Sequence, residues 1–424
     1  MGDRLASATR ETFASFRVRN FRLFFMGQGI SQIGNWLTLI AQTLLVLDLT
    51  GDGVAVWLLV ACQFAPVLIL GAWAGLVADR SDKRRLLFIV QVGAMAQSFV
   101  LAGLAFMDEP PLAAIYVVAA FGGLCMAFDN PARRAFVVEM VPEDMVHNAV
   151  SLNSAMMTSS RVIGPALGGL LITTVGYGWA FALDGFSYLA VLVGLWLMRT
   201  EDLRPSTPAP RGKGQVREGL RYVRRTPVLF VPLVMMLFVG TLAFNFQVTL
   251  PLLVTRTFDR SKVAFTVLFS VISLGSLVGA LWTARRRTIG VADVIRASLG
   301  FGLALLALAM APTVAWAFPL GFVLGMTSIG FLTASTAIVQ TEAAPEMRGR
   351  VLALQAMVFL GSTPIGGPIV GAIAEYVGPR WAVAVGGLAA LGAAAWGTLA
   401  LRDQRRQDEA DLTDDLLVDV PETA

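Results

Sequence analysis

The chain contains about twelve apolar runs of roughly 18 residues or more, and these runs restrict its possible folds more than any other feature. A helix of ~20 residues crosses the ~30 Å hydrocarbon core of a bilayer. The runs are too long for barrel strands and lack the two-residue alternation of such strands. The sequence therefore predicts an all-α polytopic membrane protein with twelve transmembrane helices.

Composition agrees with this prediction, because only 15% of the 424 residues are charged, against about 25% in an average soluble protein. Spans nine and ten are separated by a very short turn at Pro312, so the count of twelve depends on that division. The spans are expected at 21–47, 54–78, 86–106, 112–128, 146–174, 179–198, 228–250, 262–284, 291–310, 312–338, 351–374 and 380–401.

The distribution of basic residues predicts the orientation. With the N-terminus inside, only Arg256, Arg260, Lys262 and Arg380 fall outside the cell, and Arg161 lies within a span. Short loops rich in Lys and Arg stay in the cytoplasm. We therefore expect a multi-pass protein of the inner (plasma) membrane with both termini in the cytoplasm. Two termini on the same side require an even number of spans, in agreement with the count of twelve.

One long polar break divides the spans six and six. Its first half, 205–214, is rich in Pro, Ser and Gly and predicts a flexible linker. Its second half predicts a short basic amphipathic helix on the membrane face. The acidic tail is expected to be disordered. The predicted divisions are a cytoplasmic N-terminal segment (1–20), a six-helix bundle (21–199), a cytoplasmic central loop (200–226), a second six-helix bundle (227–401) and an acidic cytoplasmic tail (402–424).

The two halves resemble each other at a constant offset of 203 residues. Glu139 aligns with Glu342, and Gly164-Pro165 aligns with Gly367-Pro368. A period of this length in a twelve-span chain indicates a duplicated six-helix unit, and such duplications build the two halves of many secondary transporters. The repeat therefore predicts a carrier with two pseudo-symmetric bundles.

A charged turn, GLVADRSDKRR from Gly75 to Arg85, interrupts the apolar sequence between the second and third spans. It resembles the cytoplasmic loop signature of the major facilitator superfamily, GxxxDRxGRR, with Asp82-Lys83 in place of the usual Gly-Arg. The resemblance implies a charge lock that joins the cytoplasmic ends of the two halves while the carrier faces outward. A tight loop with cytoplasmic basic residues explains the basic run equally well, but not Asp79. The gate residues would be Gly75, Asp79, Arg80, Lys83 and Arg84.

The fifth span carries GPALGG, which resembles the GPxxGG motif of antiporters in the same superfamily. Such a motif kinks a helix and lets a neighbour pack closely. Upstream, FDNPARRAFVVEMVPEDMVHNAVSLNSA (Phe128–Ala155) resembles the drug:proton antiporter branch that holds the enterobactin exporter and macrolide efflux proteins. The resemblance implies export of a siderophore or amphipathic drug coupled to proton entry, and hence multidrug resistance. The motif residues are Gly164, Pro165, Gly168 and Gly169.

Three charged residues inside or beside spans are candidates for substrate binding or proton coupling. Arg161 lies near the middle of span five, where an unpaired charge costs at least ~2.5–3.5 kcal/mol, so it should face a cavity or a carboxylate. It can bind substrate or form a structural ion pair. Asp184 and Asp48 lie toward the outside, where a coupling carboxylate would exchange protons. For Asp48, an interfacial position is the favoured reading.

Polar residues at helical spacing along span one predict one wet face. A polar central cavity and a buried contact between helices both explain that face. Its candidate site residues are Asn35 and Gln42, and Asn245 and Gln247 match them in depth on span seven.

No motif for ATP binding, a catalytic nucleophile or a metal site occurs in a plausible setting, so the sequence indicates a non-enzymatic carrier. We expect no cofactor and no metal, with the proton gradient as the driving force. The expected partners are a small-molecule substrate, protons and the lipid bilayer, without nucleic acid, and the chain is expected to be a monomer. Two alternatives remain at this point: a transporter of lysophospholipid or another lipid, and a non-transporting membrane receptor or scaffold.

Overall fold

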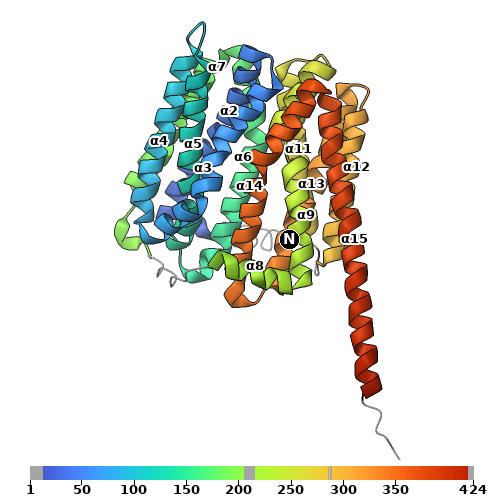
Figure 1. Ribbon diagram of the computed structural model, residues 1–424. Coiled ribbons are helices and arrows are strands. Elements are labelled where there is room, and N and C mark those ends of the chain that lie inside the picture. Colours follow the sequence, from blue (N-terminus) through green and yellow to red (C-terminus); the bar gives the residue numbers. More distant parts are fainter. Residues whose placement is uncertain (1–12, 205–214, 285, 287–288, 419–424) are drawn as a thin grey trace, which may run out of the picture.

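The computed structural model describes the backbone of residues 13–204, 215–284, 286 and 289–418. It describes their side chains except at 72, 215, 216, 284, 345, 346, 360–364 and 403–418. Helices make up nearly all of this part of the chain, and no strand occurs in it. Two helical bundles stand side by side, the first coloured blue to green and the second yellow to red (Figure 1).

The first bundle contains six long helices, which follow the first six predicted spans. They are α2 (Arg19–Thr50), α3 (Gly53–Arg80), α4 (Lys83–Ala105), α5 (Leu112–Glu139), α6 (Val146–Thr174) and α7 (Gly176–Trp196). Short helical turns η1 (Ala14–Arg17), η2 (Glu143–Met145) and η3 (Thr200–Asp202) lie before α2, before α6 and after α7.

The second bundle repeats this plan after the amphipathic helix α8 (Gln215–Arg225). Its seventh predicted span is divided into α9 (Pro227–Leu242), α10 (Phe246–Leu252) and a π-helical turn, η4 (Leu253–Thr257). The remaining helices are α11 (Lys262–Ala284), α12 (Val291–Met310), α13 (Val314–Glu342), α14 (Pro345–Tyr376) and α15 (Pro379–Val418).

The helices confirm the predicted class of a multi-pass membrane protein with twelve transmembrane helices in two bundles. Eleven of them, within the described residues, are long and apolar enough to cross a membrane. The helix α14 occupies the place of the remaining span and packs against α3, α9 and α15. Its counterpart in the repeat, α6, packs against α11 of the other bundle. The same helix of each half therefore makes the contact between the halves.

The two faces of the molecule differ, and we name them here. The termini face carries the start of α2 and the end of α15, together with α8 and the turn at Ser81–Asp82 (Figure 1). The far face carries the turn at Gly51–Asp52 and the end of η4.

Two predicted boundaries differ most from the structure. The helix α5 continues past 128 to Glu139, because the charged residues that seemed to end the span pair with each other inside the bundle. The helix α15 continues to Val418, where a disordered tail was expected (Figure 1). The predicted linker at 205–214 lies outside the described residues.

Candidate functional site

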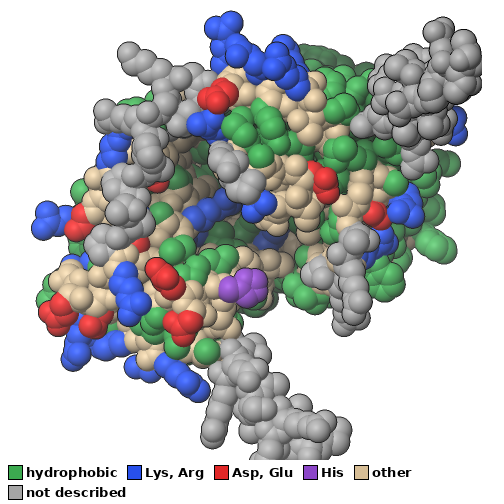
Figure 2. Space-filling view, turned by 90° about the horizontal axis from the view of Figure 1, so that it is seen from below, with side chains coloured by type: hydrophobic (Ala, Val, Ile, Leu, Met, Phe, Trp, Pro, Cys, Tyr) green, Lys and Arg blue, Asp and Glu red, His purple; other side chains and the backbone are tan. Residues whose placement is uncertain are grey.

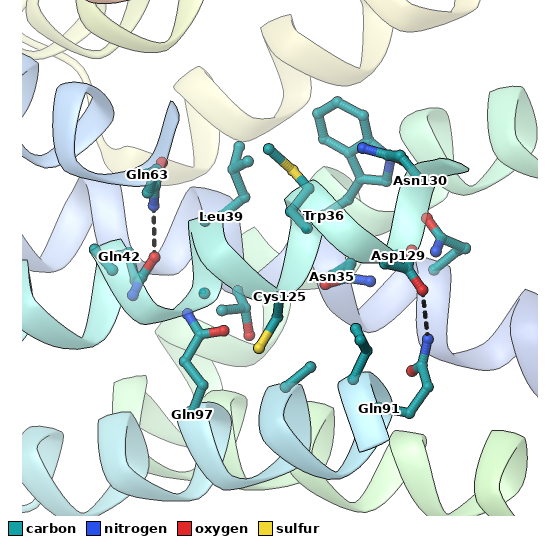
Figure 3. A pocket seen from close by; sticks show the side chains of 18 of the residues that line it. Asn35, Trp36, Leu39, Gln42, Gln63, Gln91, Gln97, Cys125, Asp129 and Asn130 are labelled. Carbon is teal, nitrogen blue, oxygen red and sulfur yellow. Dashed lines mark hydrogen bonds between the residues drawn. The ribbon is translucent and has the colours of Figure 1, made fainter. Parts of the chain in front are cut away.

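A cavity of about 300 Å³ lies in the wall of the first bundle and faces the second. It is lined by α2, α3, α4 and α5, with single residues from α6, α7 and α10 (Figure 3). Among its polar residues, Gln247 is the one contributed by the second bundle. The break between α9 and α10 precedes Gln247 by a few residues and redirects the chain there.

The cavity contains three of the four amide residues predicted from spans one and seven. Asn35 Oδ1 accepts a hydrogen bond of 2.7 Å from the Tyr188 hydroxyl, and Gln42 Oε1 accepts one of 2.6 Å from Gln63 Nε2. Gln247 lines the cavity, whereas Asn245 is buried beside it and donates to the Thr241 carbonyl. The wet face of span one is thus part of a cavity wall.

The most highly charged part of the cavity wall was missed by the sequence analysis. Asp129 and Arg133 form an ion pair on α5, and both side chains are nearly completely buried. Gln91 Nε2 donates a hydrogen bond of 2.8 Å to Asp129 Oδ1 (Figure 3). The spacing of four residues, which places two side chains on one face of a helix, was the available signal. It was overlooked because these residues were placed in a loop.

Asp184 lies behind the cavity, 1% exposed. Its Oδ2 accepts hydrogen bonds of 2.7 Å from Thr38 Oγ1 and from Ser98 Oγ, and Ser187 Oγ donates to Oδ1 at 3.4 Å. Thr38 also lines the cavity. No ion pair joins Asp184 to a basic residue of the described chain. A carboxylate buried without a cation is costly unless it is neutralised.

Arg161 is packed against an aromatic ring. Its guanidinium lies 5.4 Å from the centroid of the Trp36 ring, and its Nε has no hydrogen-bond partner. No described carboxylate forms an ion pair with it. Trp36 lines the cavity, and Arg161, which is not among the lining residues, keeps part of its surface exposed. The predicted carboxylate partner is not found among the described residues, and a cation–π contact takes its place. The other predicted environment, a position facing a cavity, stays a prediction.

Asp48 lies at the far face, where it joins the two bundles. It forms an ion pair with Lys262 at the start of α11 and accepts a hydrogen bond of 2.7 Å from the Tyr177 hydroxyl. About a third of each charged side chain is exposed. This agrees with the interfacial position that the sequence analysis favoured for Asp48.

A second ion pair between the bundles lies close by. Arg256 Nη1 lies 2.8 Å from Glu375 Oε2, which also accepts a hydrogen bond of 2.8 Å from the Gly53 amide. Arg256 donates in addition to the Gly51 carbonyl. We call the pairs Asp48–Lys262 and Arg256–Glu375 the far-face latch. Within the described residues, the contacts Gly53–Glu375, Arg256–Glu375, Arg256–Gly51 and Asp48–Lys262 thus join the bundles at this face.

The termini face is open by comparison. Figure 2 looks onto this face and shows a hollow near its centre, with basic side chains along the wall. Asp79 and Arg80, from the predicted gate, are exposed and form no described ion pair. The molecule is therefore closed at the far face and open at the termini face.

Two basic residues of the predicted gate are bound within the first bundle. Lys83 forms a buried ion pair of 2.8 Å with Glu139 at the end of α5. Arg84 Nε donates a hydrogen bond of 2.6 Å to the Leu195 carbonyl at the end of α7. Gly75 has no neighbour within 4 Å of an added methyl group. The charge lock was predicted for a carrier that is closed at the termini face. Because the termini face is open in this structure, the prediction stays untested.

The glycines of GPALGG serve two packing contacts. A methyl group on Gly164 would overlap Trp36 of α2, and one on Gly169 would overlap Thr266 of α11. One end of the motif therefore packs within the first bundle and the other end packs across the bundle interface. The helix is continuous through Pro165, and Gly168 approaches Leu37.

Comparisons with known proteins agree with this architecture. A family model described as transmembrane secretion effector matches residues 10–420. The staphyloferrin A transporter of Staphylococcus aureus is 24% identical over 84% of this chain and 90% of its own length. The macrolide efflux protein A of Streptococcus pyogenes is 22% identical over 82% of this chain and 87% of its own length. An uncharacterised major facilitator transporter of Bacillus subtilis, YfiS, is 29% identical, and that match spans about half of its length (49%).

The fold also matches solved transporters. A bacterial homologue of the human lysosomal transporter Spinster, in an inward-facing occupied conformation, aligns with a TM-score of 0.68 at 16% identity. The alignment covers 91% of this chain and 97% of that one. At this identity the likeness shows the fold alone.

Proposed function

Because the chain belongs to the transmembrane secretion effector family of major facilitator superfamily transporters, we propose that it exports a siderophore or amphipathic drug in exchange for protons. The matched family consists of transporters, so the chain is a carrier and not an enzyme. Proton coupling, the substrate and the direction of transport are the proposed parts.

The orientation follows from the positive-inside rule. The termini face carries the basic turn at 80–85 and the basic helix α8, whereas the far face has few basic residues. Lys262 and Arg256 on the far face are both paired with carboxylates. We therefore place the termini face in the cytoplasm of the inner (plasma) membrane, with one chain acting as the transporting unit.

In this orientation the closed far face and the open termini face correspond to the cytoplasm-facing state of an alternating-access cycle. Substrate would enter the cavity from the cytoplasm. Rocking of the bundles would break the far-face latch and open the cavity to the outside.

The burial of the Asp184 carboxylate without a described cation is the single observation that carries the proton-coupling proposal. Asp184 is a buried carboxylate, hydrogen-bonded by three hydroxyl groups and free of a described cation, and Thr38 connects it to the cavity. A proton taken up from the outside would neutralise it in the outward-facing state. Its release through the cavity would leave a carboxylate stabilised by hydroxyl donors.

The energy available suffices for export. One proton that enters across ~100 mV releases ~2.3 kcal/mol. At ~1.4 kcal/mol per tenfold change, this supports a substrate gradient of roughly fifty-fold. No cofactor is required for such a cycle.

The experiment uses everted membrane vesicles energised with a pH gradient, to which siderophores, macrolides and cationic dyes are added while internal pH is followed. We expect substrate-dependent proton release from vesicles with the native chain and none with Asp184→Asn. Asp108→Asn, a matched change in the exposed loop between α4 and α5, should behave as the native chain does.

Two results would contradict the proposal. Undiminished proton release by the Asp184→Asn protein would remove Asp184 from the coupling role. Absence of release with every compound, from folded native protein, would exclude proton-coupled drug export and favour lipid transport.

A further inference from the structure

Eight of the 23 residues that line the cavity carry primary amides. Glutamine and asparagine side chains from five helices face one space, and the two charged side chains among them, Asp129 and Arg133, neutralise each other. The amide residues are Gln32, Asn35, Gln42, Gln63, Gln91, Gln97, Asn130 and Gln247. The lining therefore combines several uncharged polar groups with no net charge.

Many of these polar atoms lack a partner within the described protein. Three are donors and three are acceptors, and the residues that carry them have little exposed surface. The unpartnered donors are Gln32 Nε2, Gln42 Nε2 and Arg133 Nε, and the unpartnered acceptors are Gln63 Oε1, Gln91 Oε1 and Gln247 Oε1. Because buried polar atoms nearly always have hydrogen bonds, these six indicate a ligand or water that both donates and accepts.

The pair Gln42 and Gln63 shows the pattern most clearly. Gln63 Nε2 donates to Gln42 Oε1, which leaves one donor and one acceptor free at neighbouring positions (Figure 3). If both amides were flipped, the same bond would form in reverse and one donor and one acceptor would still remain. A hydroxyl group or a carboxamide of a ligand complements such a pair, whereas a carboxylate only accepts and an ammonium only donates.

The rest of the wall is apolar. Phe64, Leu39, Val90 and Met126 line the same space as the amides. A charged ligand group would lose its water here, and the two charged residues of the cavity lining, Asp129 and Arg133, are already paired with each other. An apolar ligand body, by contrast, would be well accommodated beside the amides.

We propose that the cavity binds an electrically neutral amphipathic molecule that carries several hydroxyl or amide groups on an apolar body. The inference rests on the proposed export function and names the substrate class of the same site. Neutral ligands are selected through the amide wall, and the Gln42–Gln63 pair is its central recognition element.

The test measures equilibrium binding by isothermal titration calorimetry to the full chain in lipid nanodiscs, with empty nanodiscs as the reference. The probes share an unbranched seven-carbon skeleton: heptanoyl-N-methylglucamide (neutral, with hydroxyls and an amide), heptanoate and heptylammonium. We expect the neutral probe to bind at least about tenfold more tightly than either ion.

The variant Gln42→Leu/Gln63→Leu should weaken binding of the neutral probe by about tenfold, because two neutral hydrogen-bonding groups are lost. Gln355→Leu removes a buried amide of α14 outside the cavity and should leave binding unchanged. Equal or tighter binding of an ion, or an unaffected double variant that is folded, would overturn the inference.

This measurement needs no proton gradient, so the two proposals fail separately. Binding of the neutral probe with no substrate-dependent proton release would leave the site assignment in place and contradict proton coupling. Proton release driven by charged drugs, with no binding of the neutral probe, would support proton coupling and contradict the assignment of a neutral ligand to the cavity.

Discussion

At the residue scale, Gly34 provides the space that Asp184 occupies. The glycine lies on α2 opposite the carboxylate, and a methyl group added to it would overlap Asp184 Oδ1. Thr38, one helical turn further along α2, donates to the same carboxylate. The position of the Asp184 carboxylate therefore depends on glycine at position 34 as well as on the hydroxyl groups that donate to it.

We expect Gly34→Ala to displace the Asp184 carboxylate and to abolish substrate-dependent proton release. Alanine favours helix more than glycine does, so the loss would come from the site and not from a weakened α2. Proton release from everted vesicles is the measurement. Gly103→Ala, on an exposed part of α4 with no neighbour within 4 Å, is the matched control. Normal release by the Gly34→Ala protein would show that the position of the carboxylate is not critical.

The Asp129–Arg133 pair permits a second prediction at this scale. Asp129→Ala leaves a buried guanidinium without its counterion, and such changes cost about 3–5 kcal/mol. Removing both partners should restore part of that loss. Thermal unfolding of the single variants and of the double variant Asp129→Ala/Arg133→Ala forms the double-mutant cycle. Additive losses would contradict a coupled pair.

At the scale of elements, the far-face latch joins helices of different bundles through charged side chains that are only partly buried. Asp48 on α2 pairs with Lys262 on α11, and Glu375 on α14 pairs with Arg256 after α10. Exposed ion pairs contribute about 0.2–1 kcal/mol each. Two such pairs can close a face without preventing it from opening, which suits a carrier that must pass between two states.

We expect Lys262→Gln to shift the population toward an open far face by about two- to fivefold, in line with the small energy of one exposed pair. Spin labels at Thr174→Cys and Ser261→Cys, in a background without Cys62 and Cys125, would report the separation of the bundles by electron–electron distance measurement. Arg296→Gln removes an ion pair confined to the second bundle and should leave the distances unchanged. Identical distributions in both variants would mean that the latch does not hold the face closed.

At the scale of the whole molecule, the chain is closed at one face and open at the other, and the gate turn lies at the open face. Lys83 and Arg84 are already bound within the first bundle, whereas Asp79 is exposed. Asp79 is therefore available for a contact that forms only when the termini face closes.

Asp79→Asn should reduce transport by favouring the state seen here, while substrate binding to this state stays unchanged. Transport in vesicles and binding in nanodiscs, measured on the same variant, separate the two effects. Asp144→Asn changes an exposed carboxylate of η2 on the same face and serves as the control. Intact transport by the Asp79→Asn protein would remove Asp79 from the gate.

The sequence determined the class of fold, because a chain in a bilayer must satisfy its backbone within long apolar helices, and these are visible as runs. The 203-residue repeat predicted that the helices form two similar bundles. Asp184 could be identified as a candidate because it is a charged residue within an apolar span. The cavity wall was decided only by the tertiary structure. Gln63 on α3 and Gln91 and Gln97 on α4 stand among apolar residues. Their sequence context gives no sign that Gln63 meets Gln42, that Gln91 meets Asp129 or that Gln97 lines the same cavity.

The physical reason is that a membrane helix is apolar both toward lipid and toward its neighbours, so periodicity does not fix how each helix is rotated. That rotation depends on close contacts, such as those of Gly34 with Asp184 and Gly169 with Thr266. The packing of the helices likewise brings Thr38 and Ser98 to one carboxylate and forms the ion pairs of the far face. Sequence thus determined which helices exist, and packing determined which side chains share a space.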